Sequence, residues 1–213
     1  MAPTRAEVAA AHDKLLDDLL EPGLRVLFSG INPGLYSAAT GFHFARPGNR
    51  FWPALHRSGF TPALLPASEQ KTLLSYGLGI TNIVARASAR ADELTPAEMV
   101  AGGATLAGKV REFRPAWLAV LGVTAYRAAF GDKSARVGPQ PATIGDTRVW
   151  VLPNPSGLNA HYTLDALAEA FRDFKRATED GARTATATTA ATRGSRILSS
   201  PAPGGRAGPS GRP

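Results

Sequence analysis

The sequence has 213 residues and no cysteine. Disulfide bonds, thiol nucleophiles, zinc sites with cysteine ligands and iron–sulfur clusters all need a thiolate, so the absence of cysteine excludes all four. The histidines are few and show no metal-ligand spacing: His12, His43, His56 and His161. We therefore expect a protein that needs neither a metal ion nor another cofactor and whose chemistry depends on oxygen and nitrogen side chains.

Long apolar runs are also absent. No stretch approaches the roughly 18 consecutive apolar residues of a membrane-spanning helix. The first residues lack the basic and then apolar order of a secretory signal peptide. We expect a cytoplasmic monomer with no membrane partner.

Acidic residues are missing from the end of the chain. Positions 181–213 contain five arginines and no Asp or Glu, so of the net charge of +7 only +2 belongs to the first 180 residues. From about Thr178 the chain is rich in Ala, Thr, Gly, Ser and Pro and cannot bury enough apolar surface to offset its ordering entropy. We predict a disordered basic tail over 178–213, whose arginines either attract phosphates weakly or are dispensable.

Strand and helix patterns alternate through the rest of the chain. We expect short buried strands at 24–31, 77–84, 116–122 and 148–154, and helices at 49–58, 68–76, 95–113, 123–130 and 163–177. The helix at 95–113 begins with a capping box, in which Thr95 is followed by Pro96 and by Glu98. The alternation predicts an α/β protein with a short, mostly parallel central sheet covered by helices on both faces.

The N-terminal segment has its own helical pattern. Leu15, Leu16, Leu19 and Leu20 recur with helical spacing before a stop at 21–23. We therefore predict a helical extension over 1–20, a folded domain over 21–177 and the tail over 178–213.

Two loops place an asparagine directly after a buried strand. Asn32 lies in the loop Gly30–Gly34, and Asn154 begins the loop 154–159. Each asparagine is followed by a proline, which fixes the backbone, and then by a glycine, which lets the backbone approach a ligand. Each loop alone is also compatible with ordinary turn chemistry. Because ligands of parallel sheets bind outside the carboxyl ends of the strands, the pair predicts a site at that edge.

An aromatic stretch lies between the two loops. Residues 40–52 contain four aromatic residues and two arginines, a composition that suits stacking on a flat base and contact with phosphates. Phe51 and Trp52 stand at a helix start and are better explained as core residues. Phe42 and Phe44 lie in the loop and are the candidates for stacking.

Three motifs in order resemble those of the mismatch-specific uracil/thymine-DNA glycosylases of the uracil-DNA glycosylase superfamily. They are Gly30–Gly34, the run from Gly41 to Trp52, and Asn154–Leu158. The resemblance covers about residues 20–176 and implies a three-layer α/β/α fold. It also implies hydrolysis of the N-glycosidic bond of uracil mispaired with guanine, with double-stranded DNA as the partner.

The resemblance implies roles for individual residues of a base pocket. Asn32 is expected to hold the water that attacks the sugar, because an amide orients water without serving as a strong base. Phe44 is expected to stack on the flipped base, while backbone groups of Ile31 and Phe44 bind its edge. Ser37 is assigned to the same pocket, and Asn154 is expected to contact the leaving base or the sugar-phosphate.

The resemblance also implies a wedge that enters the duplex. Gly157, Leu158 and Asn159 form it, with Leu158 filling the gap left by the extruded nucleotide. No lysine is placed as a nucleophile, so a monofunctional glycosylase that leaves an abasic site is expected. In a bacterium such an enzyme is expected at the nucleoid.

Asp92 has two interpretations. It follows the second predicted strand on the same side as Asn32, where its carboxylate is placed to activate water, or it favours the N-terminus of the helix from Thr95. Two competing functions also stay open. One is a nucleic-acid or nucleotide-binding module without catalysis, and the other is a hydrolase of free nucleosides, for which a wedge at Leu158 has no use.

Overall fold

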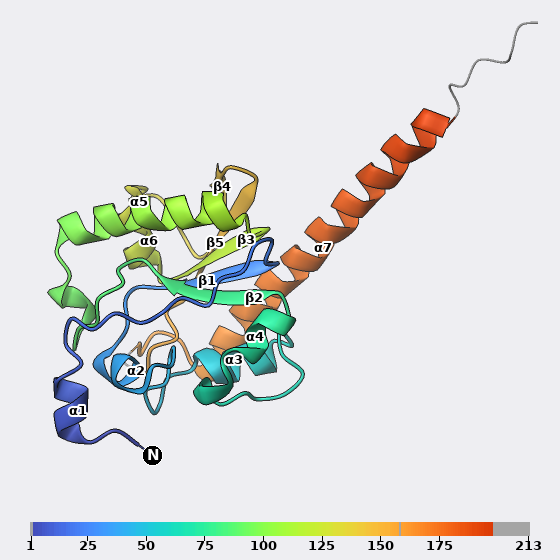
Figure 1. Cartoon of the computed structure of the whole chain (residues 1–213). Coiled ribbons are helices and arrows are strands. Elements are labelled where there is room, and N and C mark those ends of the chain that lie inside the picture. The colour runs from blue at the N-terminus through green and yellow to red at the C-terminus, as the bar shows by residue number, and fades with distance from the viewer. Residues whose placement is uncertain (1, 158, 198–213) are drawn as a thin grey trace, which may run out of the picture. The chain divides into compact units, whose positions relative to one another are not determined.

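The computed structural model describes residues 2–157 and 159–197, with side chains described as far as Gly181. The chain divides into two compact units, Met1–Thr178 and Glu179–Pro213. The first unit contains a five-stranded sheet with the strand order β2-β1-β3-β5-β4 (Figure 1). The strands are β1 (Val26–Gly30), β2 (Leu78–Asn82), β3 (Trp117–Leu121), β4 (Gly138–Ile144) and β5 (Thr147–Leu152).

The sheet is parallel except at one edge. β1 pairs in parallel with β2 and β3, and β3 pairs in parallel with β5, whereas β4 pairs antiparallel with β5. Every residue of β1, β2 and β3 is buried, as expected for strands covered on both faces. The helices are α1 (Arg5–Ala9), α2 (Leu35–Thr40), α3 (Phe51–Arg57), α4 (Thr72–Ser75), α5 (Pro96–Phe113), α6 (Val123–Phe130) and α7 (Leu164–Ile197), with short turns η1 (Ala67–Glu69) and η2 (Ala91–Glu93).

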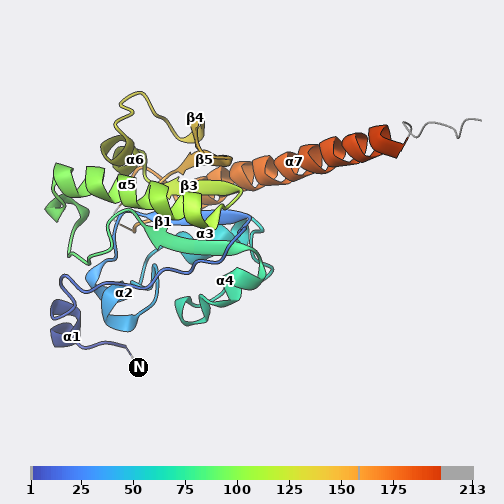
Figure 2. The same cartoon turned by 45° about the horizontal axis from the view of Figure 1, so that its top comes forward.

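Helices cover both faces of the sheet (Figure 2). Leu27 of β1 packs on one face with apolar residues of α5 and α6. Its neighbour Phe28 points to the other face, where it contacts Phe51 of α3 and Phe171 of α7. Alternation along one strand thus supplies two separate cores, and the predicted three-layer α/β/α fold is confirmed.

Helix α5 begins with the predicted capping box. Thr95 accepts a hydrogen bond from the backbone N–H of Glu98, whose carboxylate accepts one from the backbone N–H of Thr95. Two glycines in its middle then let α5 approach its neighbours. A Cβ on Gly102 would lie 2.5 Å from the carbonyl oxygen of Ile83, and one on Gly103 would lie 2.3 Å from that of Ala129 in α6.

We expect Gly103→Ala to lower the free energy of unfolding by roughly 1–3 kcal/mol, because a backbone carbonyl must move to admit the methyl group. Gly108→Ala is the matched control in the same helix, since nothing lies within 4 Å of a Cβ at Gly108. That variant should gain about 0.5–1 kcal/mol through helix propensity. Urea unfolding of both variants checks the pair, and equal effects would contradict close packing at Gly103.

The predicted N-terminal helix is wrong beyond its first turns. Helix α1 spans only Arg5–Ala9, and Asp13 adopts a positive φ of 62°. The following segment is extended, and Leu19 exchanges backbone hydrogen bonds of 2.8 and 3.0 Å with Ile80 of β2. The unpaired edge of β2 offers backbone partners, and burial of Leu16 and Leu19 adds apolar packing. The backbone pairing and the apolar burial together stabilise the extended conformation more than the helical spacing of the leucines stabilises a helix.

The last helix is longer than the expected 163–177. Leu167, Phe171 and Phe174 of α7 are buried on the sheet, as the pattern predicts. The helix then continues beyond Thr178 to Ile197, through a segment in which alanine, a strong helix former, is frequent. The rest of the predicted tail, 198–213, lies outside the described residues.

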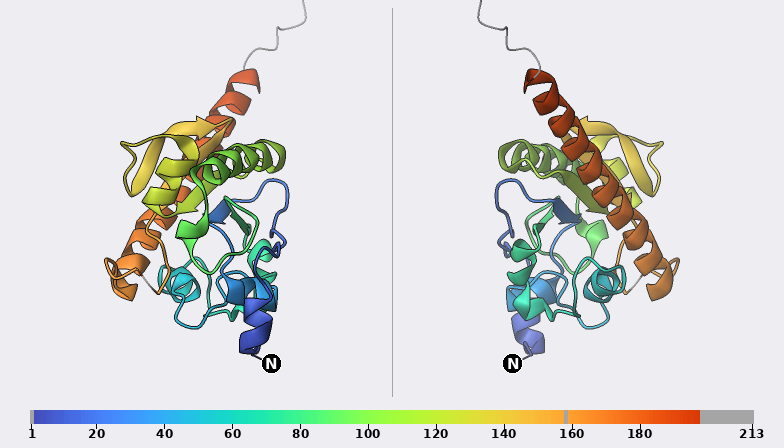
Figure 3. Two further views of the ribbon diagram at one scale, coloured as in Figure 1. Left: turned by 90° about the vertical axis from the view of Figure 1, so that its left-hand side faces the viewer. Right: turned by 90° about the vertical axis from the view of Figure 1, so that its right-hand side faces the viewer.

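The sequence patterns did not predict α2 or β4. Strand β4 contains Pro139 and Pro141, which are typical of an edge strand because proline cannot donate to a neighbour. Figure 3 shows its hairpin with β5 at the margin of the sheet. Within the described residues, no helix is both long and apolar enough to cross a membrane.

Candidate active site

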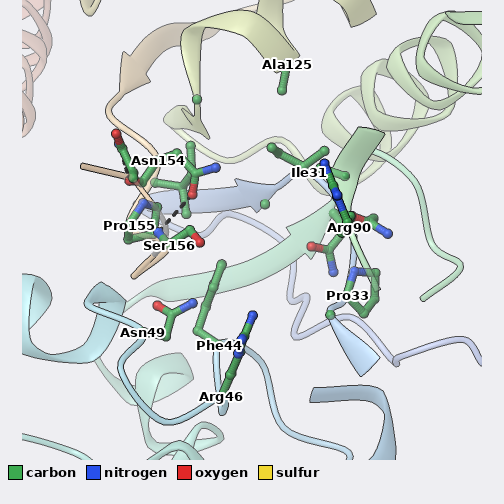
Figure 4. Close-up of a pocket in the computed structure, with 18 of the residues that line it drawn as sticks. Ile31, Pro33, Phe44, Arg46, Asn49, Arg90, Ala125, Asn154, Pro155 and Ser156 are labelled. Carbon is green, nitrogen blue, oxygen red and sulfur yellow. Dashed lines mark hydrogen bonds between the residues drawn. The ribbon is translucent and has the colours of Figure 1, made fainter. Parts of the chain in front are cut away.

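The segments that follow β1, β2, β3 and β5 line one cleft of about 690 Å³ (Figure 4). It lies at the carboxyl edge of the sheet, where connections leave in opposite directions from β1 and β3. All residues assigned to catalysis or to the base pocket line this cleft: Ile31, Asn32, Ser37, Phe44, Asp92 and Asn154. Of the predicted wedge, Asn159 also lines it, Gly157 belongs to the adjoining turn, and Leu158 lies outside the described residues.

Asn32 holds a single orientation of its side-chain amide. Its Nδ2 donates to the carbonyl oxygen of Arg86 at 3.1 Å and to Oγ of Ser88 at 2.8 Å. The Ser88 hydroxyl donates its own hydrogen to the carbonyl oxygen of Arg90 at 2.7 Å, so towards Asn32 it can only accept. Because both partners are acceptors, the NH₂ group must face them. Oδ1 makes no hydrogen bond within the described residues and is left to accept one from water in the cleft.

Asn82 is a third asparagine at the end of a strand. It pairs in register with Gly30, lines the cleft and is 5% exposed. A Cβ on Gly30 would lie 2.5 Å from Oδ1 of Asn82, so only glycine leaves room for this amide. The side chain makes no hydrogen bond within the described residues. Among the described side chains only Nε of Arg50 is fully buried without a hydrogen-bond partner, so the amide of Asn82 is open to the cleft. There it can bind the polar edge of a ligand. It was not among the residues selected from the sequence, because it lies inside the predicted strand 77–84 and is followed by Ile83 instead of a proline.

Phe44 forms an aromatic platform in the cleft. Its ring stacks on Phe51 with centroids 4.2 Å apart and an interplanar angle of 27°. Its φ of +54° lies in the left-handed region, which large side chains rarely adopt. Such backbone strain persists only where the surroundings impose it. The ring lines the cleft and can stack on a flat base there (Figure 4).

Buried polar side chains hold the Phe44 loop in place. Ser37 accepts a hydrogen bond from the backbone N–H of Ala45 at 3.2 Å, so its hydroxyl supports the loop as well as lining the cleft. Gln70 accepts from the backbone N–H of His43 at 2.7 Å. The indole of Trp52 donates to the carbonyl oxygen of His43 at 3.1 Å. Trp52 and Phe51 are both buried, which confirms their assignment to the core.

His43 makes this loop sensitive to pH. Burial lowers the pKa of its imidazole below the usual 6.5, against smaller opposing effects of the Asp17 carbonyl and the Asp18 carboxylate. The neutral ring is therefore favoured, and its Nε2 donates to the carbonyl oxygen of Asp17 at 2.9 Å.

We expect the stability of the protein to fall as the pH drops below about 6.5, because the unfolded chain then binds a proton that folded His43 resists. The contribution is at most about 1.4 kcal/mol per pH unit. His43→Gln keeps a donor but cannot titrate, so its unfolding free energy should depend less on pH between 6.5 and 5. Chemical denaturation at several pH values measures the difference, and parallel curves for the two proteins would refute the assignment.

Asn154 follows β5 and shapes the turn that comes after it. Its Oδ1 accepts from the backbone N–H of Ser156 at 2.9 Å, and its backbone carbonyl accepts from Nδ2 of Asn159 at 2.9 Å. Nδ2 of Asn154 makes no hydrogen bond within the described residues and can donate into the cleft. A Cβ on Gly157 would lie 2.7 Å from the carbonyl oxygen of Gly48, so glycine lets this turn contact the Phe44 loop closely.

Asp92 lies in the short turn η2 at the side of the cleft. Its carboxylate forms an ion pair with Arg90, and both side chains are largely exposed. The N-cap of α5 is Thr95, and within the described residues Asp92 makes no hydrogen bond to the start of that helix. Arg46 and Arg90 both line the cleft (Figure 4). The charge of Arg90 is offset by Asp92, so it is Arg46 that favours an anionic ligand there.

Among the described residues, no group of three His, Asp or Glu side chains could hold a metal ion. The chemistry that the cleft's own residues offer is thus an acceptor for water at Oδ1 of Asn32, a stacking surface at Phe44, and amide donors at Asn82 and Asn154. Residues 18–177 match the family model described as the uracil DNA glycosylase superfamily. This match covers most of the chain and supports a uracil-DNA glycosylase-type activity, the hydrolysis of an N-glycosidic bond in DNA that contains uracil. The chain therefore belongs to the uracil DNA glycosylase superfamily.

Proposed function

We propose that the protein is a monofunctional, mismatch-specific glycosylase that flips uracil out of duplex DNA, notably from G·U pairs, and leaves an abasic site. The observation that carries the proposal is the fixed amide of Asn32. Its NH₂ group is bound by two acceptors, and its Oδ1 is left to orient a water in the cleft that Phe44 also lines. Positioning of this kind lowers the entropic part of the barrier.

In the proposed reaction, the oxygen of the water held by Asn32 forms a bond to C1′ of the deoxyribose. The bond between C1′ and N1 of uracil breaks, and its electron pair leaves with the base. In this proposal Asn82 and Asn154 donate hydrogen bonds either to the base, which stabilises the negative charge that develops on uracil, or to the sugar-phosphate. The ring of Phe44 stacks on the base throughout.

The remaining step is the removal of a proton from the water. Asn32 cannot accept it at neutral pH, so catalysis by Asn32 alone is modest. We include Asp92 as the carboxylate that accepts this proton or stabilises the positive charge on the sugar. Asp92→Asn keeps the shape and removes the charge, so it should slow the chemical step about tenfold with little change in DNA affinity.

The wedge formed by Gly157, Leu158 and Asn159 completes the proposal. An inserted apolar side chain offsets part of the few kcal/mol that unstacking a base costs. Such a wedge is useful only on a duplex, which favours double-stranded DNA over free nucleosides as the substrate.

The test compares uracil opposite guanine, uracil opposite adenine, uracil in single-stranded DNA and thymine opposite guanine under single-turnover conditions. We expect fastest excision from the G·U duplex, with strand cleavage only after alkali, because a monofunctional enzyme leaves the abasic strand intact. Binding of the G·U duplex without release of uracil would support a non-catalytic binding module instead. Equal rates of excision from all uracil substrates would contradict the mismatch specificity but not the glycosylase activity.

A further inference from the structure

Arg50 links the aromatic motif to the turn that follows Asn154. Its guanidinium donates to the carbonyl oxygens of Ser156 and Tyr162, and to that of Asn159 at 2.9 Å. Its backbone N–H donates to the carbonyl oxygen of Pro155 at 3.0 Å. One residue at the start of α3 thus contacts four carbonyl groups more than 100 positions away in the sequence.

Among the residues that the structure describes, the guanidinium of Arg50 makes hydrogen bonds only to these carbonyl groups. Within the described residues, no carboxylate pairs with it, and its Nε is buried without a hydrogen-bond partner. A half-buried arginine is usually paired with an acid, because burial of an unpaired charge is costly. Arg50 is half-buried despite this cost in free energy. Its planar guanidinium holds the carbonyl groups of Ser156, Asn159 and Tyr162, a geometry that the ammonium group of lysine cannot reproduce.

We propose that Arg50 is a positioning residue that holds the backbone of Ser156, Asn159 and Tyr162 in place before DNA arrives. The inference rests on the proposed function, in which the turn that contains these residues carries the wedge. A backbone that is already held at these three residues need not be ordered there when the base is flipped, so more encounters lead to a flipped nucleotide. The side chain of Arg50 makes no hydrogen bond to Asn32, Asn82 or Phe44, and the chemistry in the cleft does not depend on it directly.

Three variants separate this role from general stabilisation. Arg50→Met keeps the apolar length and removes all donors, and Arg50→Lys keeps the charge without the fork. Arg57→Met is the matched control, since Arg57 also belongs to α3 but pairs with the exposed Asp165. Hydrogen exchange in the free, full-length protein reports on the amides of Ser156, Asn159 and His161. Base flipping is followed by the fluorescence of a 2-aminopurine placed next to 2′-fluoro-2′-deoxyuridine in a G·U duplex. This nucleotide is used because it resists excision of its uracil.

We expect Arg50→Met to speed exchange at these three amides by about tenfold or more and to reduce the flipping equilibrium by roughly 10–100-fold. Arg50→Lys should be intermediate. Arg57→Met should match the wild type in both measurements, and binding of undamaged duplex should change less than threefold in all variants.

Unchanged exchange and flipping in Arg50→Met, or the same acceleration at amides throughout the domain, would overturn the role of Arg50. If Arg50→Met does not fold, either of these results in Arg50→Lys would overturn it instead. If the wild-type protein itself flips no base, the proposed function fails as well. Normal flipping by both the wild type and Arg50→Met would overturn the role of Arg50 and leave the proposed function unaffected.

Discussion

Replacement of Asn32 by alanine is expected to slow uracil excision by roughly 100-fold or more under single-turnover conditions. The alanine removes the Oδ1 that we propose orients the water, while the cleft, the Phe44 platform and the turn after Asn154 stay in place. Asn32 lies in a loop outside the two apolar cores, so the variant should still fold, with a stability loss of about 1–3 kcal/mol from the two hydrogen bonds of Nδ2. The effect should therefore appear in the rate of the chemical step and only weakly in DNA affinity.

Thermal melts and binding of a G·U duplex on the same preparation are the controls for this variant. An Asn32→Ala protein that folds, binds and cleaves at the wild-type rate would remove the basis for water positioning by Asn32.

Replacement of Ser88 by alanine is expected to slow the chemical step by about tenfold. Ser88 is 1% exposed and is one of the two acceptors that hold Nδ2 of Asn32. Without it, only the carbonyl oxygen of Arg86 remains, and the amide of Asn32 is free to rotate away from the orientation that presents Oδ1 to water.

Ser88→Thr retains the hydroxyl and should keep most of the activity, which separates the lost hydrogen bond from a packing defect. The measurement is the single-turnover rate for both variants at saturating enzyme. Equal losses in the two variants would assign the effect to packing, and no loss in Ser88→Ala would show that Arg86 alone orients Asn32.

Local sequence signals predicted the parts of the fold that depend on local interactions. Buried strands with continuous apolar runs and the capping box of Thr95 and Glu98 were found because few other structures satisfy those patterns. The N-terminal segment was mispredicted because its conformation depends on a distant partner, Ile80, whose backbone groups pair with Leu19. Strand β4 was missed because its prolines and exposed residues resemble those of a loop.

The same distinction applies to the candidate site. Asn32 and Asn154 could be selected because each stands at the end of a predicted strand and is followed by a proline and then a glycine. Asn82 carries no such mark, since it lies inside the predicted strand 77–84. Ser88 and Arg50 act through contacts with residues 56 and more than 100 positions away, and no local pattern marks such contacts. The supporting residues of a site are set by the tertiary fold, whereas the loops that carry the site are marked in the chain.

The most direct test of the proposed activity is the release of free uracil from a G·U duplex by the full-length protein in the presence of EDTA. We predict that uracil is released in a single turnover and that the other product is an unbroken strand with one abasic site. Recovery of the duplex with its uracil in place, from a folded protein that binds this DNA, would contradict that activity.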